Sequence, residues 1–329
     1  MNKLLKDMLP LRTPMTIYID PSNICNFKCV MCPTGDDELL QSVNRPKGMM
    51  DIEVFKKFVS DLNLMVKKYK TKPTSIHLFK DGEPLLNKKL PEMIKLIVQN
   101  DLSEEIAITT NASALTEEIG EKIIKSGLKK IRYSIYELDD EGYFKVTRNK
   151  IKFSKIVENI RNFWNLKKKL KSDIKIIAKY LSANNSKDEE EKFKNIFKDI
   201  TTDLHLEYMH GWSGSEKDFS LGKNNGKAID GRDIVHKKVC PQPFSRLTVL
   251  FNGDITPCCV DWSHKLVAGN ITKVSLDEIW NENCNTLRNQ HLNHAIEKDS
   301  PCKSCSYFQG IKKNEVLDGV EAELKKIYS

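Results

Sequence analysis

The sequence predicts an α/β fold built on a parallel sheet, followed by a smaller α+β domain. Short β-type runs alternate with longer helical patterns through the first two thirds of the chain, and this pattern changes at about Asp230. Repeated strand–helix alternation is the signature of a parallel sheet. The cysteines follow the same division, since three lie before residue 33 and six after residue 239.

Six runs are expected to form strands, at residues 16–20, 75–79, 105–110, 131–136, 174–180 and 204–209. Helices are expected between them, at residues 51–68, 88–99, 115–127, 152–170 and 187–199. In the first of these helices, Phe55, Val59 and Leu62 recur at the spacing of one helix face. Because sites in parallel α/β folds gather at the C-terminal ends of strands, functional residues are expected there.

The last hundred residues have a different pattern. A short strand is expected at 247–251, with a turn at Asn252 and Gly253, a helix around 276–288 and a charged terminal helix at 312–329. We place the boundaries at 1–235 for the large domain, 236–310 for the small one and 311–329 for the helical tail. The small domain has little apolar sequence, so we expect metal binding to stabilise it.

Composition and charge indicate a soluble protein. Of the 329 residues, 40% are hydrophobic and 30% charged, and the apolar runs are too short for a membrane helix. Asp7 and Pro10 interrupt any signal-peptide core, so a cytoplasmic location is expected. The net charge is +8, but the lysines are spread over segments such as 165–171 with few aromatic residues between them. This pattern indicates solvated helix faces and no nucleic-acid site.

The nine cysteines are the most informative residues. Their odd number, in a chain without an export signal, indicates metal ligands rather than disulfides. Cys25, Cys29 and Cys32 follow the first predicted strand at x3 and x2 spacing. Three thiolates can hold three irons of a [4Fe–4S] cluster and leave the fourth iron open to a chelating ligand. The alternative is a zinc knuckle made by Cys29, Cys32 and a distant pair.

These three cysteines resemble the CxxxCxΦC signature of the radical S-adenosylmethionine (SAM) superfamily. Met31 stands at the Φ position, which is more often aromatic, and its thioether can pack against an adenine ring. The resemblance implies a partial (β/α)6 TIM-like barrel. It also implies that the methionine amine and carboxylate of the cofactor chelate the open iron, and that electron transfer then yields a 5′-deoxyadenosyl radical that abstracts hydrogen from substrate.

Segments at later strand ends are similar to other parts of the family pattern. The run KDGEP at 80–84 resembles the GGEP segment that holds the cofactor's amino group, with Asp81 in place of the first glycine. Asn111 resembles a residue near the ribose and methionine moieties. Ser134 and Arg148 resemble an SxD…R pattern whose hydroxyl and guanidinium approach ribose and carboxylate. The resemblance thus assigns cofactor contacts to Met31, Gly82, Glu83, Pro84, Asn111, Ser134 and Arg148.

The C-terminal cysteines supply a second set of four thiolates. Gly253 allows two short strands to fold back, which brings together the first two members of the set Cys240, Cys258, Cys302 and Cys305. On chemistry alone, this set fits zinc as well as an iron–sulfur cluster.

The spacing and the runs DITPCCVD, GNI and SLDEIW resemble the shortened SPASM, or twitch, domain of radical enzymes. That domain holds one auxiliary [4Fe–4S] cluster, and because no cysteine follows Cys305 we expect two clusters in all. Cys259 is an alternative ligand to Cys258, and Cys284 is expected to be a buried thiol.

Four cysteine ligands leave no iron open, so the auxiliary cluster is expected to conduct or accept electrons. The resemblance to twitch-type aminocyclitol dehydrogenases implies an oxidoreductase. In that reaction a substrate alcohol loses hydrogen to the adenosyl radical, then a proton to a protein base, then an electron to the cluster. An external donor such as flavodoxin or ferredoxin is expected to supply the reducing electron.

The substrate is expected to be a small polar molecule, such as a sugar, nucleotide-sugar or aminocyclitol. Peptide-modifying members of the family usually carry an extra N-terminal domain, and the first strand here begins near residue 16. The alternatives are a maturase that modifies a peptide or protein side chain, and a non-enzymatic zinc- or RNA-binding module. Each candidate substrate residue also has a purely structural interpretation; the candidates are His77, Lys179, Tyr208, His210, Trp212, Arg246 and Asp261.

Overall fold

The computed structural model of the protein describes residues 3–182, 186–208, 212, 217, 219–220, 227–305, 307–310 and 312–328. Its first six strands are parallel, and they form the predicted partial barrel in the spatial order β6-β5-β4-β3-β2-β1. Each overlaps a run predicted from the sequence; they are β1 (Thr16–Ile19), β2 (Ser75–Leu78), β3 (Glu105–Thr110), β4 (Lys130–Ile135), β5 (Lys175–Ser182) and β6 (Asp203–Tyr208).

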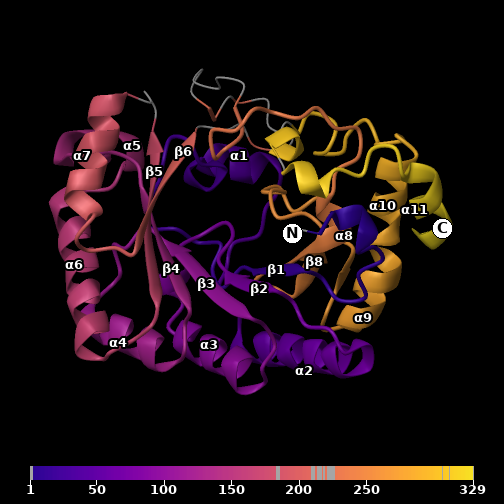
Figure 1. Ribbon diagram of the computed structural model, residues 1–329, viewed down its shortest axis with the longest axis horizontal. Coiled ribbons are helices and arrows are strands. Elements are labelled where there is room, and N and C mark those ends of the chain that lie inside the picture. Colours follow the sequence, from indigo (N-terminus) through magenta and orange to yellow (C-terminus); the bar gives the residue numbers. More distant parts are fainter. Residues whose placement is uncertain are drawn as a thin grey trace.

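The helices between these strands cover the outer face of the curved sheet (Figure 1). They are α2 (Ile52–Tyr69), α3 (Leu90–Gln99), α4 (Glu117–Lys125), α6 (Phe153–Lys169) and α7 (Lys187–Phe197), as predicted. The Asp51 carboxylate caps α2 by accepting a hydrogen bond from the Glu53 backbone N–H. Phe55 and Leu62, on the predicted face, are fully buried against the sheet. The spacing of the apolar residues therefore predicts both the helix and the face of it that packs against the sheet.

Two short helices were not predicted. They are α1 (Asp37–Ser42), after the first cysteine group, and α5 (Asp140–Thr147), after β4. Both lie toward the end of the barrel at which the parallel strands finish (Figure 1). Single turns of 3-10 helix occur at Leu5–Asp7, Pro33–Gly35, Pro84–Leu86, Tyr307–Gly310 and Lys313–Glu315.

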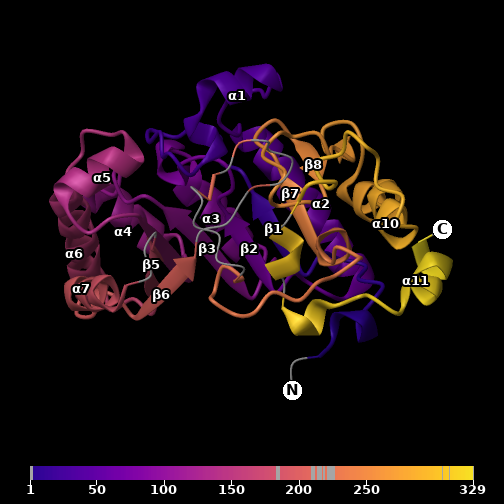
Figure 2. The ribbon, with the colours of Figure 1, turned by 90° about the horizontal axis from the view of Figure 1, so that it is seen from above.

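The C-terminal part continues the barrel sheet. Strand β7 (Arg246–Val249) pairs in parallel with β1, with Thr16 opposite Arg246. Antiparallel β8 (Asp254–Thr256) and β9 (Gly269–Asn270) extend the same sheet. Figure 2 shows this orange segment beside β1. The outer edge of β1 would otherwise present unpaired backbone groups, and β7 satisfies them.

The expectation of a thin, separate core is therefore wrong for the segment that follows β7. Leu247 and Trp280 are buried in the same apolar cluster as Ile17 of β1. The Trp280 indole N–H donates to the Leu11 carbonyl at 2.7 Å, which further joins the segment to the N-terminus. The helices of this part are α8 (Gln242–Ser245), α9 (Leu276–Glu278), the π-helical turn Ile279–Asn283 and α10 (Asn285–Leu292).

The terminal helix is shorter than predicted. Only α11 (Glu321–Tyr328) is α-helical, because Gly319 adopts a φ of +91° and turns the chain just before it. Beside this turn, the Asp318 carboxylate accepts hydrogen bonds from the Lys238 and Val239 backbone N–H groups. Tyr328 then packs in a small second apolar cluster. Over the described residues, every helix is too short or too polar to cross a membrane.

Candidate functional site

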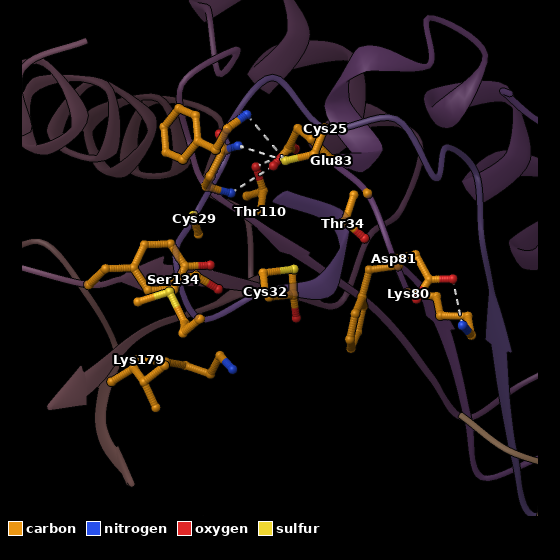
Figure 3. A pocket seen from close by; sticks show the side chains of 18 of the residues that line it. Cys25, Cys29, Cys32, Thr34, Lys80, Asp81, Glu83, Thr110, Ser134 and Lys179 are labelled. Atoms are coloured by element: carbon orange, nitrogen blue, oxygen red, sulfur yellow. Dashed lines mark hydrogen bonds and ion pairs between the residues drawn. The ribbon is translucent and has the colours of Figure 1, made fainter. Parts of the chain in front are cut away.

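A cavity of about 500 Å³ opens at the C-terminal ends of the barrel strands. Figure 3 shows Cys25, Cys29 and Cys32 facing this space, with Ser134 and Lys179 beside them. The volume lies within the usual range for small-molecule sites. The predicted site residues that line it are Cys25, Cys29, Met31, Cys32, Gly82, Glu83, Asn111, Ser134, Lys179, Tyr208 and Trp212.

The loop that carries the first three cysteines is fixed by backbone bonds to the end of α5. The Lys28 N–H donates to the Thr147 carbonyl at 2.9 Å, and the Val30 N–H to the Val146 carbonyl at 3.0 Å. Phe27 is buried and meets the Tyr143 ring edge-on at 6.0 Å between centroids. The unpredicted helix α5 therefore supports the cysteine loop.

The three thiols suit a cluster of several irons. Burial, with neighbouring thiolates adding to the effect, raises the pKa of Cys25 to about 12 and that of Cys29 well above its ordinary value. When the three thiols are all deprotonated, their negative charges require a cation close by. The Cys25 Sγ also accepts from the Phe27 N–H at 3.5 Å and the Asn111 Nδ2 at 3.9 Å. Such N–H···S bonds are typical of cluster thiolates.

A single metal ion fits this set poorly. In the described part of the chain, no three His, Cys, Asp or Glu side chains lie close enough together to hold one ion. Thiolates on one zinc ion lie roughly 3.8 Å apart, given a Zn–S bond of about 2.3 Å. In a [4Fe–4S] cluster each thiolate binds a different iron, so the sulfurs are more widely separated. The geometry favours the cluster over the zinc knuckle.

Glu83 joins the loop after β2 to the end of β3. Its Oε1 accepts from the Leu85 N–H at 3.0 Å and the Thr110 hydroxyl at 2.6 Å, and its Oε2 accepts from the Asn111 N–H at 2.8 Å. Burial raises the pKa of this carboxyl to about 7, while the three bonds oppose the shift. Gly82 lies tightly against the cysteine loop, since a Cβ there would meet the Ser22 carbonyl oxygen at 2.1 Å. Together they fix Asn111 beside Cys25.

Lys80 and Asp81 form a buried polar network with the C-terminal part of the chain. The Asp81 Oδ2 lies 2.5 Å from the Lys80 Nζ, 2.8 Å from the His264 Nε2 and 3.9 Å from the Arg45 Nη1. Lys80 also donates to the Asp261 carbonyl at 3.1 Å. Asp81, which replaces a glycine of the family pattern, therefore connects the barrel to the segment after Cys259.

Replacing Asp81 with alanine is expected to lower the free energy of unfolding by about 3–5 kcal/mol. The substitution leaves the Lys80 and Arg45 cations without their carboxylate in a site where their side chains are 2% and 0% exposed. Asp37→Ala is the matched control, because Asp37 also pairs with two lysines but is 49% exposed. The control should lose less than about 1 kcal/mol. Urea denaturation of the anaerobic holoprotein measures both, and equal losses would contradict the role of the network.

The remaining predicted residues are placed as follows. Pro84 begins the 3-10 turn after Glu83, and Arg148 is exposed at the end of α5, away from the cavity lining. Arg246 pairs with Glu315 at 3.0 Å beside a smaller cavity. Asp261 is fully buried and accepts from the Ser263 hydroxyl and the Leu266 N–H, which indicates a structural role.

Among the substrate candidates, three contact the large cavity directly. Lys179 pairs with Glu207 at 2.8 Å, and the Trp212 indole N–H donates to the Met31 carbonyl at 3.1 Å. Tyr208 lines the same wall. His77 lies against the lining residue Arg132, and His210 lies outside the described residues.

Sequence reasoning missed several lining residues, namely Tyr18, Phe79, Arg132, Glu207, Cys259 and Tyr307. One signal was available, because alternate residues of a strand share a face. Arg132 is two positions before Ser134 on β4, whose burial alternates strictly. It therefore had to face the same side as Ser134.

The second cysteine group lines one small cavity of its own, and its members are Cys240, Cys258, Cys302 and Cys305. Cys259 instead faces the large cavity, and its thiol donates to the Gln242 Oε1 at 3.5 Å. The geometry thus groups Cys258, rather than Cys259, with the other three thiols. Cys284 is fully buried, as predicted.

The two cavities share part of their walls. Val260 and Tyr307 line both the large cavity and the small cavity of the four cysteines. Burial raises the pKa of Cys240 well above its ordinary value, and the nearby Cys305 and Cys302 thiolates add to it. When they are deprotonated, these four thiols also require a positive charge nearby, which the iron–sulfur core of a cluster would supply.

Comparison with known proteins agrees with this geometry. The model of the radical SAM superfamily matches residues 19–174, and that of an iron–sulfur cluster-binding domain, SPASM, matches residues 240–306. Curated relatives include GTP 3′,8-cyclases from Vibrio atlanticus, 27% identical over 145 residues, and Staphylococcus aureus, 28% identical over 162 residues. These matches span 44% and 47% of this chain, and only 40% and 44% of those relatives.

Similar solved structures extend over nearly the whole chain. BtrN in complex with AdoMet and 2-DOIA has a TM-score of 0.53 at 20% identity, covering 92% of this chain and 98% of that one. Streptococcus suis SuiB bound to S-adenosylmethionine has a TM-score of 0.63 at 15% identity, covering 93% and 73%. The protein anSMEcpe with bound AdoMet has a TM-score of 0.60 at 16% identity, covering 96% of each chain. The chain belongs to the radical SAM superfamily and is an enzyme of that superfamily with a C-terminal SPASM-type iron–sulfur domain.

Proposed function

We propose that this enzyme is an oxidoreductase that removes hydrogen from a small polar substrate and passes an electron to an auxiliary [4Fe–4S] cluster. The observation that carries the proposal is the wall of Val260 and Tyr307 shared by the two cavities. An auxiliary cluster behind this wall lies next to whatever occupies the large cavity. When bound, the first cluster and SAM supply the 5′-deoxyadenosyl radical of the family.

The contacts described above support the following assignment of the first site. Cys25, Cys29 and Cys32 hold the cluster that faces SAM. The cofactor lies against Met31, Gly82, Asn111 and Ser134, and Glu83 fixes Asn111 through its backbone N–H. Cys240, Cys258, Cys302 and Cys305 hold the second cluster, which makes two in all.

A substrate alcohol must also lose a proton, and Glu207 is the carboxylate best placed to accept it. Three carboxylates line the large cavity, of which Asp81 and Glu83 are buried in bonds to the protein. Glu207 binds only Lys179 among the contacts seen in the described residues, and its side chain is 22% exposed. Lys179 then stabilises the charge of Glu207 and orients its Oε2.

The ligands of related proteins support a small substrate and keep one alternative open. BtrN binds 2-DOIA, and the GTP 3′,8-cyclases are named for a nucleotide. SuiB and anSMEcpe, in contrast, were solved with the precursor peptide SuiA and the Cp18Cys peptide. The second candidate is therefore a maturase that modifies a peptide side chain. An external donor such as flavodoxin or ferredoxin, and a cytoplasmic location, belong to both proposals.

The test is the stoichiometry of turnover. The reconstituted enzyme, with SAM and dithionite, is incubated with sugars, nucleotide-sugars and aminocyclitols in one arm and with peptides in the other. Oxidation of a small substrate is expected to yield one 5′-deoxyadenosine per two-electron-oxidised product, measured by mass spectrometry. A product isomeric with its substrate would contradict the oxidation. Turnover confined to the peptide arm would favour the maturase.

A further inference from the structure

Arg132 is a cation in the large cavity that has no carboxylate partner. It projects from β4, its Nη2 lies 3.1 Å from the His77 Nδ1, and its guanidinium carbon lies 4.8 Å from the centre of the Phe79 ring. Its Nε is buried and makes no hydrogen bond. Within the described residues, no Asp or Glu oxygen comes within 4.0 Å of its nitrogens, although several other buried or half-buried cations are paired in this way.

The other cations of the cavity wall are neutralised by the protein. Lys80 pairs with Asp81 at 2.5 Å, and Lys179 pairs with Glu207 at 2.8 Å. Just outside the wall, Arg246 pairs with Glu315. Arg132 is thus the cation whose charge is left for a ligand, and an unpaired charge in such an environment is costly.

His77 holds the guanidinium in place without neutralising it. Burial lowers the pKa of His77 to about 3, and the charge of Arg132 adds to the effect, so the ring is neutral. Because a guanidinium only donates, the His77 Nδ1 must accept from Arg132. The Phe79 ring supports the other face of Arg132 by a cation–π contact. The guanidinium of Arg132 is therefore held in a fixed orientation before a ligand binds.

Arg132 lies deeper in the barrel than the residues assigned to SAM. Arg132 precedes Ser134 by two residues on β4, which corresponds to about 7 Å along the strand. Its neighbours across the sheet are Thr109 and Ile177, whereas Ser134 lies opposite Lys179. The cysteine loop follows the end of β1, and Asn111 comes two positions after Thr109, the partner of Arg132. An anion bound at Arg132 therefore belongs to the molecule beneath the cofactor.

We propose that Arg132 binds an anionic group of the substrate, a phosphate or a carboxylate, through its planar fork. The inference rests on the proposed function in one respect, namely that the substrate occupies the large cavity. It adds the substrate class, which is a small molecule that carries a negative charge, and it assigns a binding residue. Arg132 acts here as an anchor that orients the substrate below the cofactor.

The test is binding to the anaerobically reconstituted enzyme saturated with SAM, measured by calorimetry. Three probes share one carbon skeleton and differ in their charged group: glycerol 3-phosphate carries a phosphate, glycerate carries a carboxylate, and glycerol is neutral. The wild type is expected to bind one of the two anions at least tenfold more tightly than glycerol. Arg132→Gln should remove this preference, and Arg132→Lys should keep part of it. Arg161→Gln, on the exposed face of α6, is the matched control and should bind as the wild type does.

Each contrary result overturns the inference. A wild type that prefers neither anion has no anion site in the cavity, and a preference that survives in Arg132→Gln belongs to another residue. If Arg132→Gln instead weakens SAM binding tenfold, the guanidinium binds the carboxylate of the cofactor. Because these measurements need no turnover, their failure is distinct from failure of the oxidation, which the product stoichiometry tests.

Discussion

Replacing Cys25, Cys29 and Cys32 together with alanine is expected to abolish 5′-deoxyadenosine formation from SAM. These are the thiols that line the large cavity near Met31 and Asn111, and three ligands leave an iron open to the cofactor. The four C-terminal thiols lie in a separate cavity, so the second cluster should stay. Iron is expected to fall from roughly eight to roughly four per chain, the content of one [4Fe–4S] cluster.

Chromatography of anaerobic reactions with dithionite measures the nucleoside, and a colorimetric assay measures the iron. Cys284→Ala is the control, since Cys284 is a buried thiol that lines neither cavity. It should keep both clusters and the rate of cofactor cleavage. Cleavage by the triple variant would show that the open iron is held elsewhere.

The fold was largely predictable because its strands and helices are set by local patterns. Alternation in β4 and the helical spacing in α2 depend on neighbours along the chain, and both elements appear where expected. The partner of β7 was not predictable, since it depends on which edge of the finished sheet lacks a neighbour. The sequence therefore predicted a thin core for the small domain, whereas Leu247 and Trp280 are buried with barrel residues.

The site divides in the same way. The first cysteine group is local in sequence, and its spacing alone indicates a cluster with an open iron. Asp81 and His264 are 183 positions apart, and His77 and Arg132 are 55 apart, so no local pattern reveals either contact. The sequence also could not decide whether Cys258 or Cys259 is the ligand of the second cluster. Adjacent residues point in different directions, and only the fold shows which thiol faces the other three.

Replacing Cys302 and Cys305 together with alanine is expected to uncouple the reaction. The oxidised product should fall to background while 5′-deoxyadenosine still forms, because the first cluster is intact and the substrate radical has lost its electron acceptor. The shared wall of Val260 and Tyr307 is the reason to place that acceptor here. Iron should again fall to that of one cluster, and the continued formation of 5′-deoxyadenosine distinguishes loss of the second cluster from loss of the first.

Cys259→Ala is the matched variant for this experiment. Its thiol faces the large cavity and Gln242, so the variant should retain both clusters if Cys258 is the ligand. The main alternative is that the second cluster only stabilises the loop between α10 and Tyr307, which lacks regular strands and helices in its described residues. In that case the double variant would form oxidised product at the full rate despite its lost iron. Electron acceptance predicts the opposite, a cofactor that is still cleaved and a substrate that is not oxidised.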